Sequence, residues 1–176
     1  KGSKGCQGRI SFLLCVLCVA SYQPRPIVCY NSFNSKKEKQ PHMRTYRLAL
    51  IGFGNVGQGL TTILRDYGAN IAGQHGADFR IVAVNTARKG RIYNPDGIDP
   101  GQLLEASAEK RRLDTIPAAY SGWDVQKVIA ESNADVVIEM TASDLLTGQP
   151  ATDYIRAAIA HDRHVITTNK GPVGLF

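Results

Sequence analysis

Cysteine is missing from most of this 176-residue sequence. All four cysteines lie within the first 29 residues, and none occurs from Met43 to Phe176. The longer segment therefore needs no disulfide bond, which is typical of proteins in a reducing compartment. We accordingly predict a cytoplasmic location.

An excess of charge is also missing from residues 43–176. They contain 14 Lys or Arg and 14 Asp or Glu, whereas residues 1–42 contain seven Lys or Arg and one Glu and account for the whole formal charge of +6. Domains that bind nucleic acids usually present a concentrated basic surface. The neutral balance of the longer segment therefore argues against a nucleic-acid partner.

No hydrophobic run in the sequence is long enough to cross a membrane. The longest covers residues 10–20, which is eleven residues, and a membrane-spanning helix needs about 20. We therefore expect no membrane partner. The basic start and the short apolar run imitate a secretory signal, but the sequence does not begin with Met, and residues 32–42 are polar and featureless.

Residues 1–42 thus differ from the rest of the chain, and Met43 stands directly before the first strand pattern. We interpret them as a tail, disordered or artefactual, that is unrelated to the chemistry; a targeting segment and a cysteine site are the alternatives. Cys15 and Cys18 form a C-x-x-C pair, but the pair lies inside the apolar run and lacks a second ligand pair at zinc-site spacing. We interpret these cysteines as small hydrophobic residues and expect no metal site.

From Met43 onward, strand patterns alternate with helix patterns. Apolar runs predict strands at 46–51, 79–84, 134–140 and 164–168. Helical patterns predict a helix from Asn55 to a point between 67 and 74, and further helices at 102–110, after Asp124 and from Pro150, with Asp99 and Asp124 as N-caps. The stretch 86–100 has the composition of a loop. Strands that alternate with helices imply crossover connections, so we predict an α/β fold with a parallel sheet.

The first strand runs into a glycine-rich loop, GFGNVG, at residues 52–57. A G-x-G-x-x-G motif between a strand and a helix is typical of dinucleotide-binding domains of the Rossmann type, a doubly wound parallel sheet. Gly52 permits the tight turn, Gly54 lets the backbone approach a pyrophosphate, and Gly57 lets the helix pack closely on the strand. We predict that residues 43–176 form such a domain; a glycine-rich turn without a ligand is the alternative. The predicted cofactor-binding residues of the loop are Gly52, Phe53, Gly54, Asn55, Val56 and Gly57.

The end of the second strand indicates which dinucleotide is bound. A carboxylate at this position binds the ribose 2′-hydroxyl of NAD, but the sequence has Asn85 there, and Arg88 and Lys89 follow shortly after. Arginine offers a bidentate fork to a 2′-phosphate. We therefore predict that Arg88 and Lys89 bind NADP and that NAD is also usable; a solvated loop is the alternative.

More specific runs occur later in the chain. GQPA at 148–151 leads into a helix, and HVITTNKGPV follows at 164–173. Together with LIGFGNVGQG at 50–59 and DVVIEMT at 135–141, these runs resemble the homoserine dehydrogenase family. The resemblance extends from about residue 47 to 174. The loop at 168–172 is its most discriminating part, because many dehydrogenases share the glycine motif.

The resemblance implies reversible hydride transfer between NAD(P)H and a small-molecule substrate, L-aspartate 4-semialdehyde, giving L-homoserine on the way to threonine, methionine and isoleucine. It also implies roles for single residues. Phe53, Asn55 and Val56 would contact the diphosphate, Arg88 the adenosine ribose or its 2′-phosphate, Thr141 the nicotinamide ribose, and Asn169 and Lys170 the nicotinamide and substrate.

Lys170 is the candidate catalytic residue, through positioning of the substrate and nicotinamide. It lies just beyond a predicted parallel strand, where open α/β sheets bind their ligands, and a cation there could hold a substrate carboxylate; a surface lysine is the alternative. In the family, a second domain binds the amino acid, forms the homodimer and provides the main catalytic lysine. We expect residues 43–176 to be truncated before that substrate domain.

Three other functions share the predicted fold. Two are enzymes with the same nucleotide-binding fold, dihydrodipicolinate reductase and aspartate-semialdehyde dehydrogenase. Aspartate-semialdehyde dehydrogenase needs a nucleophilic cysteine, and residues 43–176 contain none. A non-catalytic dinucleotide-sensing module would need no lysine turn beside the nicotinamide and would need a partner-binding region. The neutral charge argues against a module that reads DNA.

Overall fold

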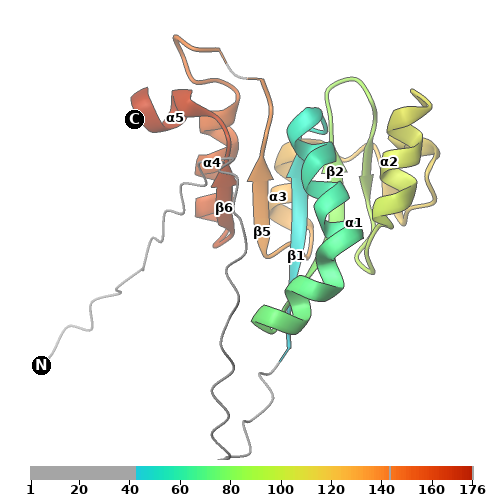
Figure 1. Cartoon of the computed structure of the whole chain (residues 1–176). Helices are drawn as coiled ribbons and strands as arrows, with labels where there is room; N and C mark the ends of the chain where they lie inside the picture. Colours follow the sequence, from blue (N-terminus) through green and yellow to red (C-terminus); the bar gives the residue numbers. More distant parts are fainter. Residues whose placement is uncertain (1–42, 143, 176) are drawn as a thin grey trace, which may run out of the picture. The chain divides into compact units, whose positions relative to one another are not determined.

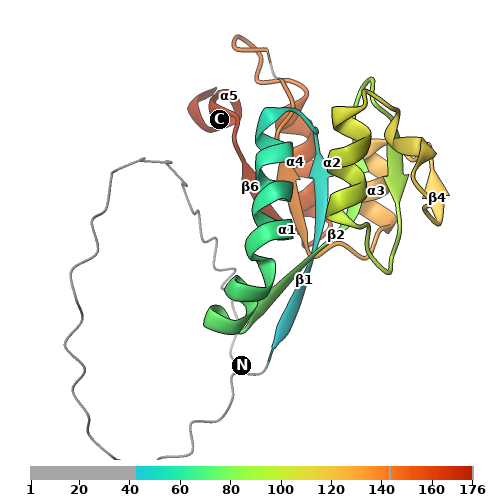
Figure 2. The same cartoon turned by 45° about the vertical axis from the view of Figure 1, so that its right-hand side comes forward.

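The computed structural model describes residues 43–142 and 144–175. The predictions about residues 1–42, including the tail and the pair Cys15 and Cys18, lie outside these described residues. Within them, a sheet is covered on both faces by helices (Figures 1 and 2).

Six strands form the sheet, in the order β4-β3-β2-β1-β5-β6. Their bounds are Arg44–Ile51 for β1, Ala77–Asn85 for β2, Arg91–Tyr93 for β3, Tyr120–Ser121 for β4, Val136–Glu139 for β5 and His164–Thr167 for β6. The helices are Asn55–His75 for α1, Pro100–Ala108 for α2, Val125–Glu131 for α3, Ala151–Ala160 for α4 and Lys170–Leu175 for α5, and Leu113–Thr115 forms a 3-10 helix, η1. Strands β2, β1, β5 and β6 are parallel, which confirms the predicted α/β class.

The sheet is mixed, however, because it also has two antiparallel strands at one edge that the prediction of a parallel sheet did not include. β3 pairs antiparallel with β2, and β4 pairs antiparallel with β3. The prediction that 86–100 is entirely a loop was therefore wrong at Arg91–Tyr93. These strands are too short for a periodic pattern to show them, and their pairing is set by a tight turn that returns the chain from Asn85 to Arg91.

Side-chain caps start two of the helices where the sequence predicted. Asp99 accepts a hydrogen bond from the amide of Gln102 at 2.8 Å, and Asp124 accepts one from the amide of Lys127 at 2.7 Å. Both caps occupy an amide that the first turn of a helix leaves without a partner. Helix α1 ends at His75, one residue beyond the predicted limit, where Gly76 adopts a left-handed conformation with φ of 64°.

Alternate residues of the central strand point to opposite faces of the sheet, as the pleat requires. Leu48 and Leu50 of β1 pack in the cluster that includes residues of α1 and α2, whereas Ala49 and Ile51 pack in the cluster that includes α3 and α4. Ala49, Leu50 and Ile51 are wholly buried. Burial on both faces explains why this strand reads as a continuous apolar run, and it confirms the doubly wound arrangement.

Two arginines tie the amino ends of the parallel strands together. Arg47 of β1 makes a bidentate ion pair with Asp135, just before β5, through contacts of 2.9 and 2.8 Å. Arg163, just before β6, donates to the carbonyls of Ala134 at 2.8 Å and Ser132 at 2.9 Å. These contacts hold β1, β5 and β6 in register at the amino ends of the parallel strands.

The pair of Arg47 and Asp135 makes stability depend on pH. The hydrogen bonds from Arg47 hold the pKa of Asp135 below its ordinary value. A lowered folded-state pKa stabilises the fold above the pKa of the unfolded carboxyl, about 3.9, and the contribution is lost as the pH falls through the folded-state pKa. We expect Asp135→Asn to lower the free energy of unfolding at pH 7 by about 0.5–1 kcal/mol, since solvent screens the pair.

Urea unfolding of the wild type and the variant from pH 7 to pH 3 measures this effect. The difference between them should shrink as the solution is acidified. Asp96→Asn, at an exposed aspartate, is the matched control and should show little difference at either end. A difference for Asp135→Asn that stays constant across the range would contradict the assignment.

Candidate functional site

The glycine loop lies at the carboxyl end of β1 and packs tightly against the end of β5. Gly52 has φ of +100°, and a Cβ there would lie 2.6 Å from the carbonyl oxygen of Met140. A Cβ on Gly57 would lie 3.1 Å from the carbonyl oxygen of Gly52 and 3.3 Å from the Phe53 ring. These two positions therefore require glycine for the turn and for close packing of the helix.

The start of α1 presents backbone amides with no side chain over them. Gly54 is the N-cap residue, no side chain caps the helix, and its first turn contains no acidic residue. The first intrahelical bond runs from the amide of Gln58 to the carbonyl of Gly54, so the amides of Asn55, Val56 and Gly57 precede it. A Cβ on Gly54 would meet nothing within 4 Å. This positive helix end can bind an anionic group such as a diphosphate.

Phe53 contributes to this loop only through its backbone. Its side chain is 2% exposed and belongs to the core on the α1 side of the sheet, so it cannot contact a ligand. Its carbonyl accepts a hydrogen bond from Nζ of Lys89 at 3.3 Å, and Lys89 also lies 3.4 Å from Oγ of Ser107. Lys89 therefore lies beside the glycine loop, close to the start of α1.

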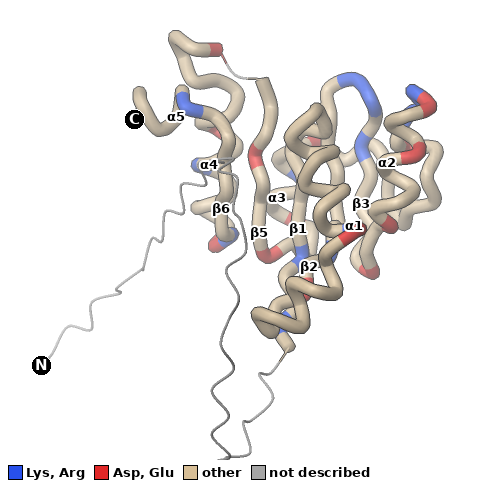
Figure 3. Tube along the Cα trace, viewed as in Figure 1, with Lys and Arg blue, Asp and Glu red and all other residues tan. Residues whose placement is uncertain are grey.

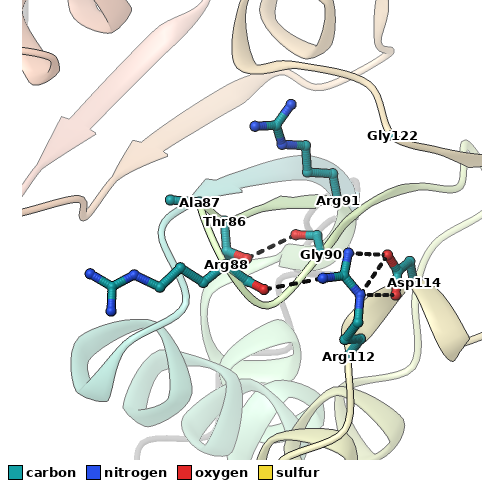
Figure 4. Close-up of a pocket in the computed structure, with 8 residues that line it drawn as sticks. All are labelled: Thr86, Ala87, Arg88, Gly90, Arg91, Arg112, Asp114 and Gly122. Atoms are coloured by element: carbon teal, nitrogen blue, oxygen red, sulfur yellow. Dashed lines mark hydrogen bonds and ion pairs between the residues drawn. The ribbon is translucent and has the colours of Figure 1, made fainter.

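A pocket of about 260 Å³ opens beyond the carboxyl end of β2. Figure 4 shows the residues that line it: Thr86, Ala87, Arg88, Gly90, Arg91, Arg112, Asp114 and Gly122. Asn85, which the sequence analysis placed at this position, does not line it, because its side chain is buried and donates from Nδ2 to the carbonyl of Trp123 at 2.8 Å. The position of the carboxylate in NAD-specific domains is thus taken by a buried amide, and the neighbouring pocket is lined by three arginines.

The pocket has more positive than negative charge. Its only acidic lining residue is Asp114, which is paired with Arg112 at 2.5 Å, and this contact lowers the pKa of Asp114. Neither Arg88 nor Arg91 forms an ion pair within residues 43–142 and 144–175. A concentration of basic residues is visible along the β2–β3 connection in Figure 3. These unpaired arginines suit a phosphate.

Sequence reasoning missed Arg91 and Arg112 in this pocket. Arg91 opens β3, which was not predicted, and Arg112 precedes η1, far from the glycine loop in sequence. Its guanidinium reaches the carbonyl of Arg88 at 3.4 Å. Contacts of the segment before η1 with the β2–β3 connection bring Arg112 to Arg88, so no local signal in the sequence identified it.

The ends of β5 and β6 carry a polar cluster around a buried carboxylate. Glu139 is wholly buried and accepts from the amide and hydroxyl of Thr141, at 2.8 and 2.5 Å. It also accepts from the hydroxyl of Thr167 at 2.8 Å and from Nδ2 of Asn169 at 2.6 Å. The structure thus brings together Thr141 and Asn169, which the resemblance assigned to the nicotinamide half, and adds Glu139, which the sequence analysis had not chosen as a site residue.

Lys170 follows this cluster directly and is exposed. It is the first residue of the short helix α5, so the predicted turn is the first turn of a helix. Within the described part of the chain, its side chain forms no hydrogen bond or ion pair. The ammonium group is therefore available to an anionic ligand at this edge.

These three groups of residues lie along one edge of the sheet, at the carboxyl ends of its parallel strands (Figure 1). Open α/β sheets bind dinucleotides at this edge, with the diphosphate over the first helix. Among residues 43–142 and 144–175, no cluster of His, Cys, Asp and Glu has the arrangement of a metal site, and no helix has the length and apolar character to cross a membrane.

Comparison with known proteins agrees with this arrangement. Residues 52–173 match the model of the homoserine dehydrogenase NAD-binding domain family. An NAD(+)-dependent homoserine dehydrogenase of Pseudomonas canavaninivorans is 32% identical over 133 residues, which cover 76% of this chain and 38% of that protein. A homoserine dehydrogenase of Methanocaldococcus jannaschii is 32% identical over 128 residues, covering 73% and 38%. The chain thus spans well under half the length of these relatives.

Among solved structures, a hyperthermophilic archaeal homoserine dehydrogenase in complex with NADPH superposes with a TM-score of 0.59. The sequence identity is 19%, and the match covers 74% of this chain and 38% of that one. At this identity the likeness concerns the fold alone. It agrees with the α/β fold described above.

The first two glycines of the motif allow a direct test of the loop geometry. We expect Gly52→Ala to lower the free energy of unfolding by about 2 kcal/mol or more, because of its positive φ and the contact with Met140. Gly54→Ala is the matched control: its φ is −87° and its Cβ would face open space, so stability should change by less than about 0.5 kcal/mol. Urea unfolding distinguishes the two, and equal losses would contradict the described loop.

Proposed function

This chain belongs to the family of homoserine dehydrogenase NAD-binding domains, and we propose that it is the dinucleotide-binding part of a homoserine dehydrogenase. The whole protein would interconvert L-homoserine and L-aspartate 4-semialdehyde with NADP, and NAD is also usable. The chain spans 38% of the length of these relatives, and we propose the activity for the whole protein. We propose further that the full-length protein is a cytoplasmic homodimer that binds small molecules and neither nucleic acid nor membranes.

The observation that carries this proposal is the uncapped start of α1 above a glycine loop that has no room for a side chain at Gly52 and little at Gly57. A diphosphate has the charge and size to bind those amides. From there, the adenosine half of the dinucleotide would extend towards the arginine pocket at β2. The nicotinamide half would extend towards the cluster at the ends of β5 and β6.

The arginine pocket supports a preference for the phosphorylated dinucleotide. Arg88 and Arg91 would bind the 2′-phosphate, while Lys89, which contacts the carbonyl of Phe53, would lie nearer the diphosphate. Asn85 cannot take the place of the usual carboxylate because its amide is committed to Trp123. NAD would still bind through the glycine loop, which is common to both nucleotides.

When bound, the nicotinamide supplies the hydride chemistry. The residues of this chain would bind and orient it. Thr141 and Asn169 would contact the nicotinamide half, and the exposed ammonium group of Lys170 would hold a substrate carboxylate next to it. Placing the reacting groups in contact converts an encounter in solution into a step within one complex.

The first test is whether the 176-residue chain binds NADPH without oxidising homoserine. We expect binding because the phosphate loop is complete, and no turnover because the resemblance assigns the substrate domain and its lysine to a region beyond this chain. Trp123 is the only tryptophan and adjoins Gly122 of the pocket, so quenching of its fluorescence measures binding. Homoserine oxidation by this chain would contradict the proposed division of labour, and failure to bind any nicotinamide dinucleotide would contradict the proposed function.

The second test separates the two adjacent cations. We expect Arg88→Ala to weaken NADPH binding about ten- to a hundredfold and to change NADH binding little, because a charge-assisted hydrogen bond to phosphate contributes roughly 1.5–3 kcal/mol. Lys89→Ala should weaken NADPH binding and NADH binding by factors similar to each other, since the Lys89 side chain lies beside the glycine loop. Arg65→Ala, on an exposed residue of α1, controls for the loss of one positive charge.

All titrations are made at one salt concentration, because salt screens these contacts. Equal losses of NADPH and NADH in Arg88→Ala would place that side chain on the diphosphate or in folding. No loss of either nucleotide would show that Arg88 faces solvent, and the basis for NADP preference would disappear.

A further inference from the structure

Both oxygens of the buried Glu139 carboxylate accept hydrogen bonds from neighbouring residues. One oxygen accepts from the amide and hydroxyl of Thr141, and the other accepts from the hydroxyl of Thr167 and from Nδ2 of Asn169. An ionised carboxylate accepts hydrogen bonds and donates none. With no exposed surface, Glu139 cannot touch a ligand itself, so any effect on a ligand must pass through the groups it holds.

Among those groups, Asn169 has an orientation that the cluster determines. Its Nδ2 donates to Glu139 at 2.6 Å and to the carbonyl of Thr141 at 2.7 Å, which uses both hydrogens of the amide. If the amide were turned over, Oδ1 would face a carboxylate and a carbonyl, and neither can donate. Because the choice between amide oxygen and nitrogen follows from the hydrogen-bond network, Nδ2 belongs on the inner side.

The other end of the same amide is left as an acceptor. Asn169 is partly exposed, its Oδ1 accepts no hydrogen bond within the described residues, and this oxygen is not buried. This oxygen therefore lies accessible at the end of β6, beside Thr141. The carboxylate behind Nδ2 also polarises the amide, which strengthens Oδ1 as an acceptor.

On the premise of the proposed function, we propose that Glu139 is a positioning residue that turns the Asn169 amide so that Oδ1 accepts a hydrogen bond from the carboxamide NH₂ of the nicotinamide. The arginine pocket at β2 takes the phosphate-bearing adenosine half, so the nicotinamide half lies at the β5 and β6 end of the same edge. Its carboxamide is the group there with an N–H to donate. Glu139 thereby selects a ligand that donates at this point.

The test compares two ligands that differ only in this donor. NADP⁺ and its 3-acetylpyridine analogue share the carbonyl, but the analogue has a methyl group where NADP⁺ has NH₂. Titrating both into the 176-residue chain gives the ratio of their dissociation constants. We expect the wild type to bind NADP⁺ about tenfold more tightly, which corresponds to about 1.4 kcal/mol.

Glu139→Gln is the central variant. The amide of Thr141 can only donate, so the oxygen of the new side chain stays opposite it, and the new NH₂ faces Thr167 and Asn169. Asn169 must then turn or withdraw, which removes the outward acceptor. We expect the ratio to fall from about ten to about one. Asn169→Ala removes the acceptor at a partly exposed position and should lower the ratio to the same value.

Arg163→Met is the matched control for a purely structural effect. It removes hydrogen bonds at the amino end of β6, so it should reduce thermal stability and leave the ratio near ten. Because both ligands are titrated into one sample, the ratio does not depend on the fraction of folded protein. If Glu139→Gln yields no folded protein, Asn169→Ala still decides whether the acceptor exists.

The outcomes separate this inference from the proposed function. A wild-type ratio near one, or an unchanged ratio in Glu139→Gln or Asn169→Ala, would overturn the positioning role while NADP⁺ binding itself persists. A ratio that falls equally in Arg163→Met would show a general structural effect and would also overturn it. If the wild type binds neither nucleotide, the proposed function fails, and this inference fails with it.

Discussion

The parallel pairing of β1 with both β2 and β5 is the constraint on which the rest of this structure depends. It places the ends of all these strands at one edge, where the amide of Gly52 bonds to the carbonyl of Asn85 and the amide of Met140 bonds to the carbonyl of Ile51, each at 2.8 Å. Gly52 is thereby held between two neighbouring strands, and Met140 lies where a side chain at that glycine would project. The turn that leads into α1 is therefore held by contacts with both neighbouring strands.

Two different environments then develop on either side of the glycine loop. On the β2 side, the β2–β3 connection, β3 and the segment before η1 bring Arg88, Arg91 and Arg112 into one pocket that contains a single acid. On the β5 side, Glu139 is buried, but its charge is matched by four donor groups. A dinucleotide has the same asymmetry, since one half carries the additional phosphate and the other carries a neutral carboxamide.

Much of the fold could be predicted from the sequence, because the signals were local. Asp99 and Asp124 cap the helices that follow them, and the apolar run of β1 reports burial on both faces. The glycine motif lies in the strand–loop–helix order that it indicated. The short strands β3 and β4 could not be predicted, because two or three residues carry no period and their pairing depends on a partner strand. Likewise, Phe53 lies within the motif, but only the packed core shows that its side chain points away from any ligand.

By itself, then, the sequence determined the α/β class, the position of the glycine loop and, to within one residue, where each parallel strand ends. These properties follow from hydrophobic period, capping and the conformational freedom of glycine, all of which act over a few residues. Only the tertiary structure decided that Arg112 joins Arg88, that Asn85 is committed to Trp123, and that Glu139 orients Asn169 across 30 residues of sequence. A hydrogen bond between side chains distant in sequence depends on distance and direction in the folded chain, and strand pairing sets both.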